Sequence, residues 1–280
     1  MAGSDTASDL VKQHIRQLLC ETHLRMTPTD LVTALSVHFP EMDRKRFRTT
    51  IRTMVSQGIL AYTHHFSSTH IEMASGGAMA VSERLSLNAP ITKTDNPSKC
   101  LNLMIQSGSA FGRGDHPTTL LSLKAIAWIA KQWENSSGTR GTRTLDIGTG
   151  TGVLAMAAVL LGSGKSVGLD IDRLACREAM HNIRVNGLQG KVHIVAGGLD
   201  ALGPVSFDMI MANLRPPTLV GLMAVMARKT VQNGYWVLSG FRPEEQGDVL
   251  AQLPSCFHPV WTRNNRNWSA IAVRHVKGGF

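Results

Sequence analysis

The run TLDIGTGTGVLAMAAVLLG, residues 144–162, constrains the fold of this chain more than any other stretch. Its apolar start predicts a strand that reaches Asp146, and its alanine-rich end predicts a helix. Glycines at alternate positions from 148 to 152 join the two, and a glycine turn lets a ligand approach the backbone closely. Ligands of open parallel sheets bind at the carboxyl ends of strands, so this run predicts an α/β fold with a ligand site at the turn.

The rest of residues 111–275 supports the same fold, because apolar strands alternate with helical stretches as in a parallel α/β sheet. Strands are expected at 142–147, 166–170, 192–195, 207–212, 235–239, 258–262 and 268–273. Hydrophobic residues make up 43% of the chain and charged residues 18%, which is ordinary for a globular protein with a full core.

Several features favour a cytoplasmic protein. We find no apolar run long enough to cross a membrane and no basic-then-apolar secretory signal, so no membrane partner is expected. The four cysteines lie far apart without a Cys-x-x-Cys pair, which suits a reducing compartment and disfavours a zinc ribbon. Histidines 64, 65 and 70 lack such a pair as well, so no metal site is expected.

Residues 1–76 predict a separate small domain. Three stretches of helical spacing precede two short strands around a His/Ser turn, which is the element order of a winged-helix domain. In that fold the third helix enters a DNA groove. Here the corresponding helix carries Arg44, Lys45, Arg46, Arg48 and Arg52. Two interpretations stay open, a nucleic-acid-binding face or the solvated face of a protein-binding module.

The remaining chain divides into a β-containing connector at 77–110 and the main domain at 111–280. The formal net charge of +9 favours polyanionic neighbours such as nucleic acid or ribosomes, but it does not choose among them.

Three polar residues narrow the ligand expected at the glycine turn. Asp170 ends the second strand and follows Gly148 by twenty-two residues, where a carboxylate can accept both ribose hydroxyls of an adenosine ligand; capping the next helix is the alternative. Asp146 precedes the first glycine, where it would repel a pyrophosphate but attract a cationic methionine tail. Asn213 ends the fourth strand beside the same crevice. Together they favour S-adenosylmethionine over NAD.

At this point the sequence resembles the PrmA family of ribosomal-protein lysine methyltransferases. The segments that carry the resemblance are VSERLSL, AFGRGDHPTT, LDIGTGTGVLAMAA, VGLDID, NLRPPTL and LSGFRPEEQ. The resemblance implies a seven-stranded Rossmann-like methyltransferase sheet with an antiparallel last strand. It also implies that residues 111–119 form a lid over S-adenosylmethionine.

The candidate cofactor-binding residues, from the turn and the resemblance together, are Phe111, Gly112, Thr119, Asp146, Gly148, Gly150, Gly152, Asp170 and Asn213. Three departures concern the substrate. Arg113 and Asp115 replace family threonines, Arg215 and two prolines follow Asn213, and the N-terminal segment does not resemble the family's ferredoxin-like domain.

The leading function expected is a protein N-methyltransferase for a lysine or an N-terminal amine, with a protein substrate, ribosomal in the family. Asn213 is the candidate catalytic residue, orienting the amine. His116 is a candidate proton acceptor with a structural role as the alternative, and Trp268 and Phe111 are candidate walls of the substrate channel.

Two rival functions stay open. One is a nucleic-acid methyltransferase that holds its substrate with the basic helix, and the other is a nucleic-acid-binding regulator that senses the cofactor. The methylated molecule, the number of methyl groups and the oligomeric state are not determined by the sequence.

Overall fold

The computed structural model describes residues 3–21, 26–56, 59–65, 68–73, 79–88, 101–105, 111–112, 114, 116–135 and 141–276. The chain divides into two compact units, Met1–Gly77 and Ala78–Phe280.

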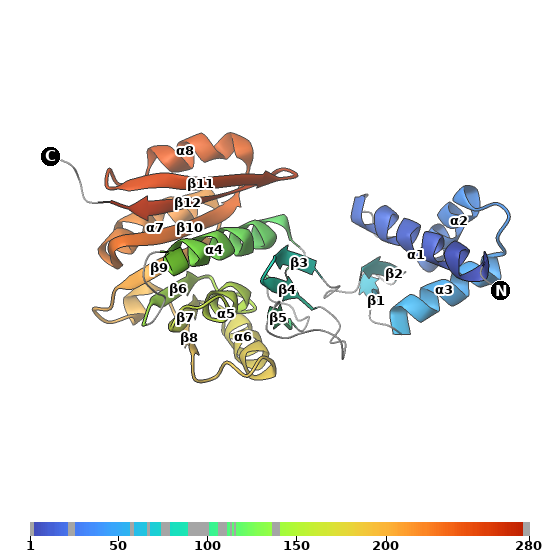
Figure 1. The fold of residues 1–280 in the computed structure, drawn as a ribbon, viewed down its shortest axis with the longest axis horizontal. Helices are drawn as coiled ribbons and strands as arrows, with labels where there is room; N and C mark the ends of the chain where they lie inside the picture. The colour runs from blue at the N-terminus through green and yellow to red at the C-terminus, as the bar shows by residue number, and fades with distance from the viewer. Residues whose placement is uncertain are drawn as a thin grey trace. The chain divides into compact units, whose positions relative to one another are not determined.

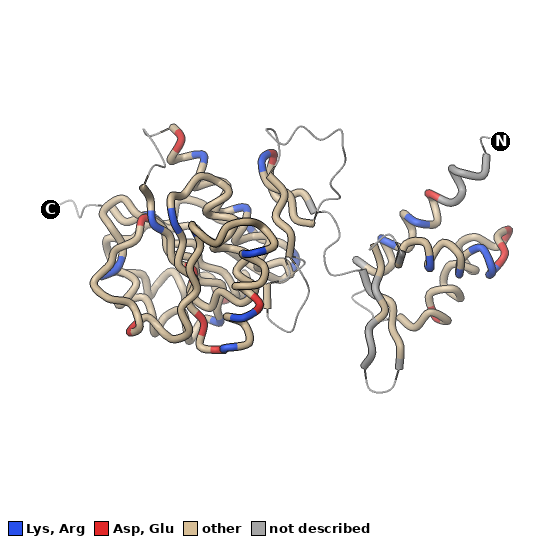
Figure 2. The backbone as a smooth tube through the Cα atoms, turned by 90° about the horizontal axis from the view of Figure 1, so that it is seen from below, with Lys and Arg blue, Asp and Glu red and all other residues tan. Residues whose placement is uncertain are grey.

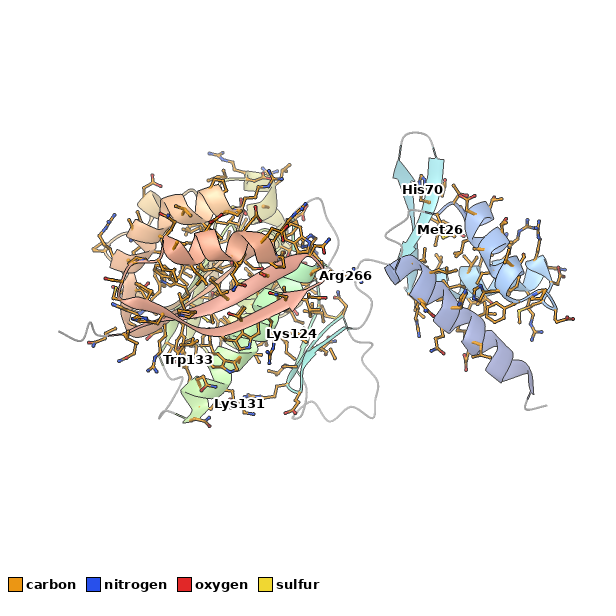
Figure 3. The ribbon with its side chains drawn as sticks, turned by 90° about the horizontal axis from the view of Figure 1, so that it is seen from above. Met26, His70, Lys124, Lys131, Trp133 and Arg266 are labelled. Atoms are coloured by element: carbon orange, nitrogen blue, oxygen red, sulfur yellow. The ribbon has the colours of Figure 1, made fainter. Side chains whose placement is uncertain are left out.

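The first unit contains three helices followed by an antiparallel hairpin (Figure 1). Its elements are α1 (Gly3–Glu21), α2 (Pro28–His38), α3 (Arg44–Ser56), β1 (Leu60–His65) and β2 (Ser68–Met73). The Thr27 hydroxyl accepts a bond from the Asp30 N–H, and the Asp30 carboxylate accepts one from the Thr27 N–H, so a capping box starts α2. Met26 bridges to Ile71 of β2, beside the hairpin (Figure 3). The element order is as expected; the winged-helix assignment stays a prediction.

The second unit begins with a small three-stranded sheet. Its strands are β3 (Met79–Ser82), β4 (Leu85–Leu87) and β5 (Leu101–Leu103), in the order β3-β4-β5. Leu85, Leu87 and Leu103 are buried in the same apolar core as helices α4 and α5, described below. The described part of the 77–110 segment therefore packs within the second unit.

The main sheet has seven strands, as expected. They are β6 (Arg143–Ile147), β7 (Lys165–Asp170), β8 (Val192–Ala196), β9 (Phe207–Asn213), β10 (Thr230–Phe241), β11 (Phe257–Asn265) and β12 (Trp268–His275). Their order is β11-β12-β10-β9-β6-β7-β8, and β12 runs antiparallel to both of its neighbours. The strand order reverses between β6 and β9, which places a crevice at their carboxyl ends.

Helices cover both faces of this sheet (Figure 1). They are α4 (Pro117–Asn135), α5 (Val153–Leu160), α6 (Arg173–Val185), α7 (Pro216–Arg228) and α8 (Gln246–Ala251), with short 3₁₀ turns at Leu199–Ala201 and Pro243–Glu245. Strand alternation builds the two cores. Met209 and Met211 of β9 pack with α4 and α5, whereas Ile210 and Ala212 pack with α7.

Helix α4 lies along the sheet and carries Lys124, Lys131 and Trp133 (Figure 3). The Trp133 ring contacts Tyr235 of β10 edge-on, with 6.4 Å between ring centroids. Within the described residues, no helix is long and apolar enough to cross a membrane.

Candidate active site

A cavity of about 710 Å³ opens at the carboxyl ends of the central strands. Its lining comes from the turns after β6, β7, β8 and β9, from Phe111, His116 and Thr118, and from the start of β12. The residues that line it include Phe111, His116, Thr118, Gly148, Gly150, Asp170, Ile171, Leu199, Asn213, Arg215 and Trp268. The site therefore lies where the reversal of strand order predicts it.

The glycine turn is shaped by protein contacts. Gly150 has a φ of +53°, and a Cβ there would overlap the carbonyl oxygen of Phe111. At Gly148, with a φ of +69°, a Cβ would come within 2.7 Å of Leu214 Cδ2. Backbone conformation favours glycine at both positions, and at Gly150 close packing against the Phe111 backbone requires it as well. Gly152 begins α5 and lies outside the cavity lining.

Phe111 and Gly112 are held against this turn through their backbone carbonyl groups. The Thr151 N–H donates to Phe111 O at 3.0 Å, and the Thr151 hydroxyl donates to Gly112 O at 2.7 Å. Phe111 lines the cavity with a side chain that is 55% exposed, whereas Gly112 does not line it. Arg113 and Asp115, the two family departures noted above, lie outside the described residues.

Asp146 is 1% exposed and faces the interior of the protein. Its Oδ2 accepts bonds from the Thr149 hydroxyl at 2.6 Å and from the Ala155 N–H at 3.3 Å. Burial raises the pKa of this carboxyl to about 7, against the two hydrogen bonds, which lower it, and a smaller raising effect of Asp170. Asp146 holds the glycine turn against α5, and its expected contact with the methionine tail stays a prediction, since it does not line the cavity.

Asp170 does line the cavity. Its Oδ2 accepts a bond from the Gly150 N–H at 2.9 Å, and its Oδ1 accepts one from the Asp172 N–H at 3.0 Å. A carboxylate has about four lone-pair sites, so two sites remain for ligand hydroxyls. The helix cap that the sequence left as an alternative is made by Asp172, whose Oδ1 accepts from the Leu174 N–H at 2.8 Å.

Asn213 enters the cavity with its amide held by a neighbour. Its Nδ2 donates to the Thr118 hydroxyl at 3.1 Å, and that hydroxyl lies 2.8 Å from His116 Nδ1. The Thr118 N–H also points at His116 Nδ1, at 3.3 Å, which makes Nδ1 the acceptor and the Thr118 hydroxyl its donor. The chain of bonds Asn213–Thr118–His116 therefore fixes the Asn213 amide with its NH₂ group toward Thr118.

The His116 ring lies between two aromatic side chains of the cavity. Its centroid is 5.0 Å from that of Phe111 and 5.1 Å from that of Trp268, both edge-on. Phe111 and Trp268, which were expected to line the substrate channel, both line this cavity.

The cavity brings together Phe111, Gly148, Gly150, Asp170 and Asn213 from the candidate set, and it does not include Gly112, Thr119, Asp146 or Gly152. Thr119 is buried, and its hydroxyl oxygen is buried without a hydrogen-bond partner among the described residues. Sequence reasoning missed Thr118 as a lining residue, whereas Arg215, noted above as a departure that concerns the substrate, does line the cavity. Thr118 stands beside Thr119 in the sequence, and only the start of α4 at Pro117 decides which of the two faces the cavity.

Comparison with known protein families shows to which family the chain with this cavity belongs. The sequence model described as "Ribosomal protein L11 methyltransferase (PrmA)" matches residues 77–276. The chain belongs to the PrmA family. The match includes every residue of the cavity and leaves the first 76 residues of the chain outside the PrmA region.

Individual PrmA relatives agree with this assignment. The chain is 35% identical over 174 residues to the ribosomal protein L11 methyltransferase of Citrifermentans bemidjiense, covering 62% of this chain and 56% of that protein. It is 38% identical over 148 residues to the protein of the same name from Syntrophotalea carbinolica, covering 53% and 46%. The chain thus spans about half the length of these curated relatives.

A solved structure shows the same fold. The ribosomal protein L11 methylase of Lactobacillus delbrueckii subsp. bulgaricus aligns with a TM-score of 0.61 at 22% identity, covering 71% of this chain and 99% of that one.

Proposed function

We propose that this protein is an S-adenosylmethionine-dependent N-methyltransferase that modifies an amine of ribosomal protein L11, a lysine side chain or the N-terminal amine. One observation carries the proposal. Asp170 and Asn213, from the ends of β7 and β9, face a single cavity on either side of the glycine turn.

The residues present fit S-adenosylmethionine. Asp170 keeps lone pairs for the ribose hydroxyls, and Leu169, Ile171 and Leu199 give an apolar wall for the adenine. The cavity volume lies within the usual range of small-molecule sites, about 300–1,000 Å³. When bound, the cofactor supplies an electrophilic methyl group on a sulfonium.

Asn213 supports the amine-directed chemistry. Because its Nδ2 is used by the Thr118 hydroxyl, its carbonyl oxygen is left to accept a bond from an amine in the cavity. A free lysine has a pKa of about 10.4 and must lose a proton before it attacks. The apolar surfaces of Phe111, Leu222 and Trp268 disfavour a charged amine, which lowers its pKa.

The bonding of His116 favours the structural role left open by the sequence. Its Nδ1 accepts from Thr118, so the proton of the neutral ring sits on Nε2. Neither nitrogen then offers a free acceptor to the amine.

The choice of substrate rests on the names of the relatives, which are ribosomal protein L11 methyltransferases. Ribosomal proteins are made in the cytoplasm, which supports a cytoplasmic place of action.

The proposal is tested by transfer of labelled methyl groups from S-adenosylmethionine to ribosomes and to purified L11. We expect label in one protein band that survives nuclease and is lost on protease treatment. Label that is lost with nuclease instead would favour the rival nucleic-acid methyltransferase. Cofactor binding without any label would favour the cofactor-sensing regulator.

A further inference from the structure

The first unit contains a polar hollow of its own. We call it the arginine groove; it has a volume of about 230 Å³ and lies between the start of α2, one face of α3 and strand β1. Its lining residues are Pro28, Thr29, Val32, Thr33, Arg44, Arg48, Ile51, Arg52 and Tyr62. Nothing in the proposed methyl transfer uses this surface, and it lies outside the family match.

Three arginines form a row along the groove. Arg44, Arg48 and Arg52 are four residues apart, so they lie on one side of α3 at a rise of about 6 Å each. All three are exposed, while Phe47 on the same helix is buried in the core of the unit. Lys45 also lies on α3 but does not line the groove.

The row has no acidic partner in the part of the chain that the structure describes. Two carboxylates of this unit, Asp30 and Asp43, are used at helix starts. Asp30 accepts bonds from the Thr27 backbone N–H and hydroxyl, and Asp43 accepts one from the Lys45 N–H. Figure 2 marks the described Lys and Arg of this unit in blue and its described acids in red. Lys and Arg of residues 1–77 are nearly balanced by Asp and Glu, so the positive charge is local to α3.

The groove also offers an apolar surface beside the charges. Val32 and Ile51 are buried at its floor, and the Tyr62 ring on β1 is 44% exposed. A row of guanidinium groups next to an exposed aromatic ring is the combination that binds phosphates and stacks unpaired bases.

We propose that the arginine groove binds single-stranded RNA, with Arg44, Arg48 and Arg52 on consecutive phosphates and a base against Tyr62. A hollow lined by an aromatic ring suits an unstacked base, whereas a duplex keeps its bases stacked and presents a groove into which a helix protrudes. An acidic peptide would pair with the arginines but has no planar group for Tyr62. The choice of RNA over DNA rests on the proposed function, since a ribosomal protein lies beside RNA.

The test is a titration of the whole 280-residue chain with a fluorescent single-stranded RNA of about 12 nucleotides, within the site sizes of single-strand-binding folds. No cofactor or L11 is added, so the result is independent of methyl transfer. In single-strand binding each phosphate contact contributes about 0.7 to the slope of log K against log salt. We therefore expect Arg48→Gln/Arg52→Gln to reduce that slope by about 1.4 and the affinity at 0.1 M salt by about 25-fold.

A matched control separates the groove from overall charge. Lys45→Gln/Arg46→Gln removes the same charge from exposed positions of the same helix outside the groove, and we expect less than a threefold loss. We expect Tyr62→Ala to weaken binding about tenfold by loss of stacking, and Tyr62→Phe to bind like the wild type. Circular dichroism verifies that each variant is folded.

Four results would each overturn the proposal. They are no binding of the RNA, equal losses in the two double variants, tighter binding of a duplex or a poly-glutamate peptide, and equal binding of DNA of the same sequence. Loss of methyl transfer to L11 with RNA binding intact would refute the proposed function and leave the groove standing.

Discussion

Among the described residues, Thr118 holds the side-chain amide of Asn213 in its orientation. The Thr118 hydroxyl is the acceptor for Asn213 Nδ2 and the donor to His116 Nδ1. Thr118→Val removes both bonds at nearly constant volume and frees the amide to rotate. If the proposed function holds, we expect kcat for L11 methylation to fall about threefold to tenfold, the worth of one hydrogen bond.

Rescue distinguishes this positioning role from a packing role. Thr118→Ser keeps the hydroxyl and loses only a methyl group, so we expect kcat within twofold of the wild type. We expect the Kd for S-adenosylmethionine to change little in either variant. A loss of kcat in the serine variant equal to that in the valine variant would contradict the positioning role.

Asp146 predicts a pH dependence of stability. Its folded pKa of about 7 lies above the ordinary value of 3.8. Between these two pH values the folded state therefore holds a proton that the unfolded state has lost. The stabilising contribution of Asp146 to the folded state is complete below pH about 4 and is lost as the pH rises through 7.

Asp146→Asn cannot ionise, and its carbonyl oxygen can still accept from Thr149 and Ala155. We expect the difference in unfolding free energy between this variant and the wild type to shift in favour of the variant by up to about 4 kcal/mol as the pH rises from 4 to 8. Urea unfolding across this pH range checks the prediction. Parallel curves for the two proteins would show that the carboxylate is not destabilised by burial.

At the scale of elements, the contact between the glycine turn and the Phe111 backbone predicts an effect of substitution. Gly150 and Gly187 both have positive φ, at +53° and +66°, but only at Gly150 would a Cβ meet another group. We expect Gly187→Ala to cost about 1–2 kcal/mol from the backbone conformation alone. Gly150→Ala should cost about 1–3 kcal/mol more, because it displaces Phe111.

The five tryptophans all lie in the second unit, so their fluorescence during urea unfolding reports on that unit alone. Equal losses in the two alanine variants would contradict the close backbone contact between Gly150 and Phe111.

An element could be predicted where its hydrophobic sequence pattern is strong. The seven strands were expected from apolar runs, and the antiparallel last strand from the family resemblance; the structure confirms both. Strand β10, however, extends to Thr230 and Phe241, well beyond the expected 235–239, because Gln232 and Asn233 interrupt its apolar pattern. No range was predicted for α4, whose start at Pro117 lies inside the FGRGDHPTT segment.

The site was predicted where it depends on strand ends and missed where it depends on side-chain direction. Asp170 and Asn213 follow from strand ends, which meet at one edge of a parallel sheet. The inward turn of Asp146 and the choice of Thr118 over Thr119 depend on the local direction of each side chain. A sequence pattern carries little information on that direction.

At the scale of the whole molecule, the chain joins a PrmA-family unit to a unit outside the family match. The proposed activity belongs to the PrmA-family unit, residues 78–280, and the arginine groove to residues 1–77, so variants in one unit should leave the other unchanged. Arg48→Gln/Arg52→Gln should retain S-adenosylmethionine binding with an unchanged Kd, measured by calorimetry. A large change in that Kd would show that the two sites are coupled.

The most direct test of the proposed function is mass spectrometry of purified L11 after incubation with S-adenosylmethionine and this protein. We expect L11 to gain the mass of one or more methyl groups on a lysine or on its N-terminal amine, and Asn213→Ala to abolish the gain at equal cofactor occupancy. An unchanged L11 mass, with the cofactor bound by the wild type, would contradict the assignment of this substrate.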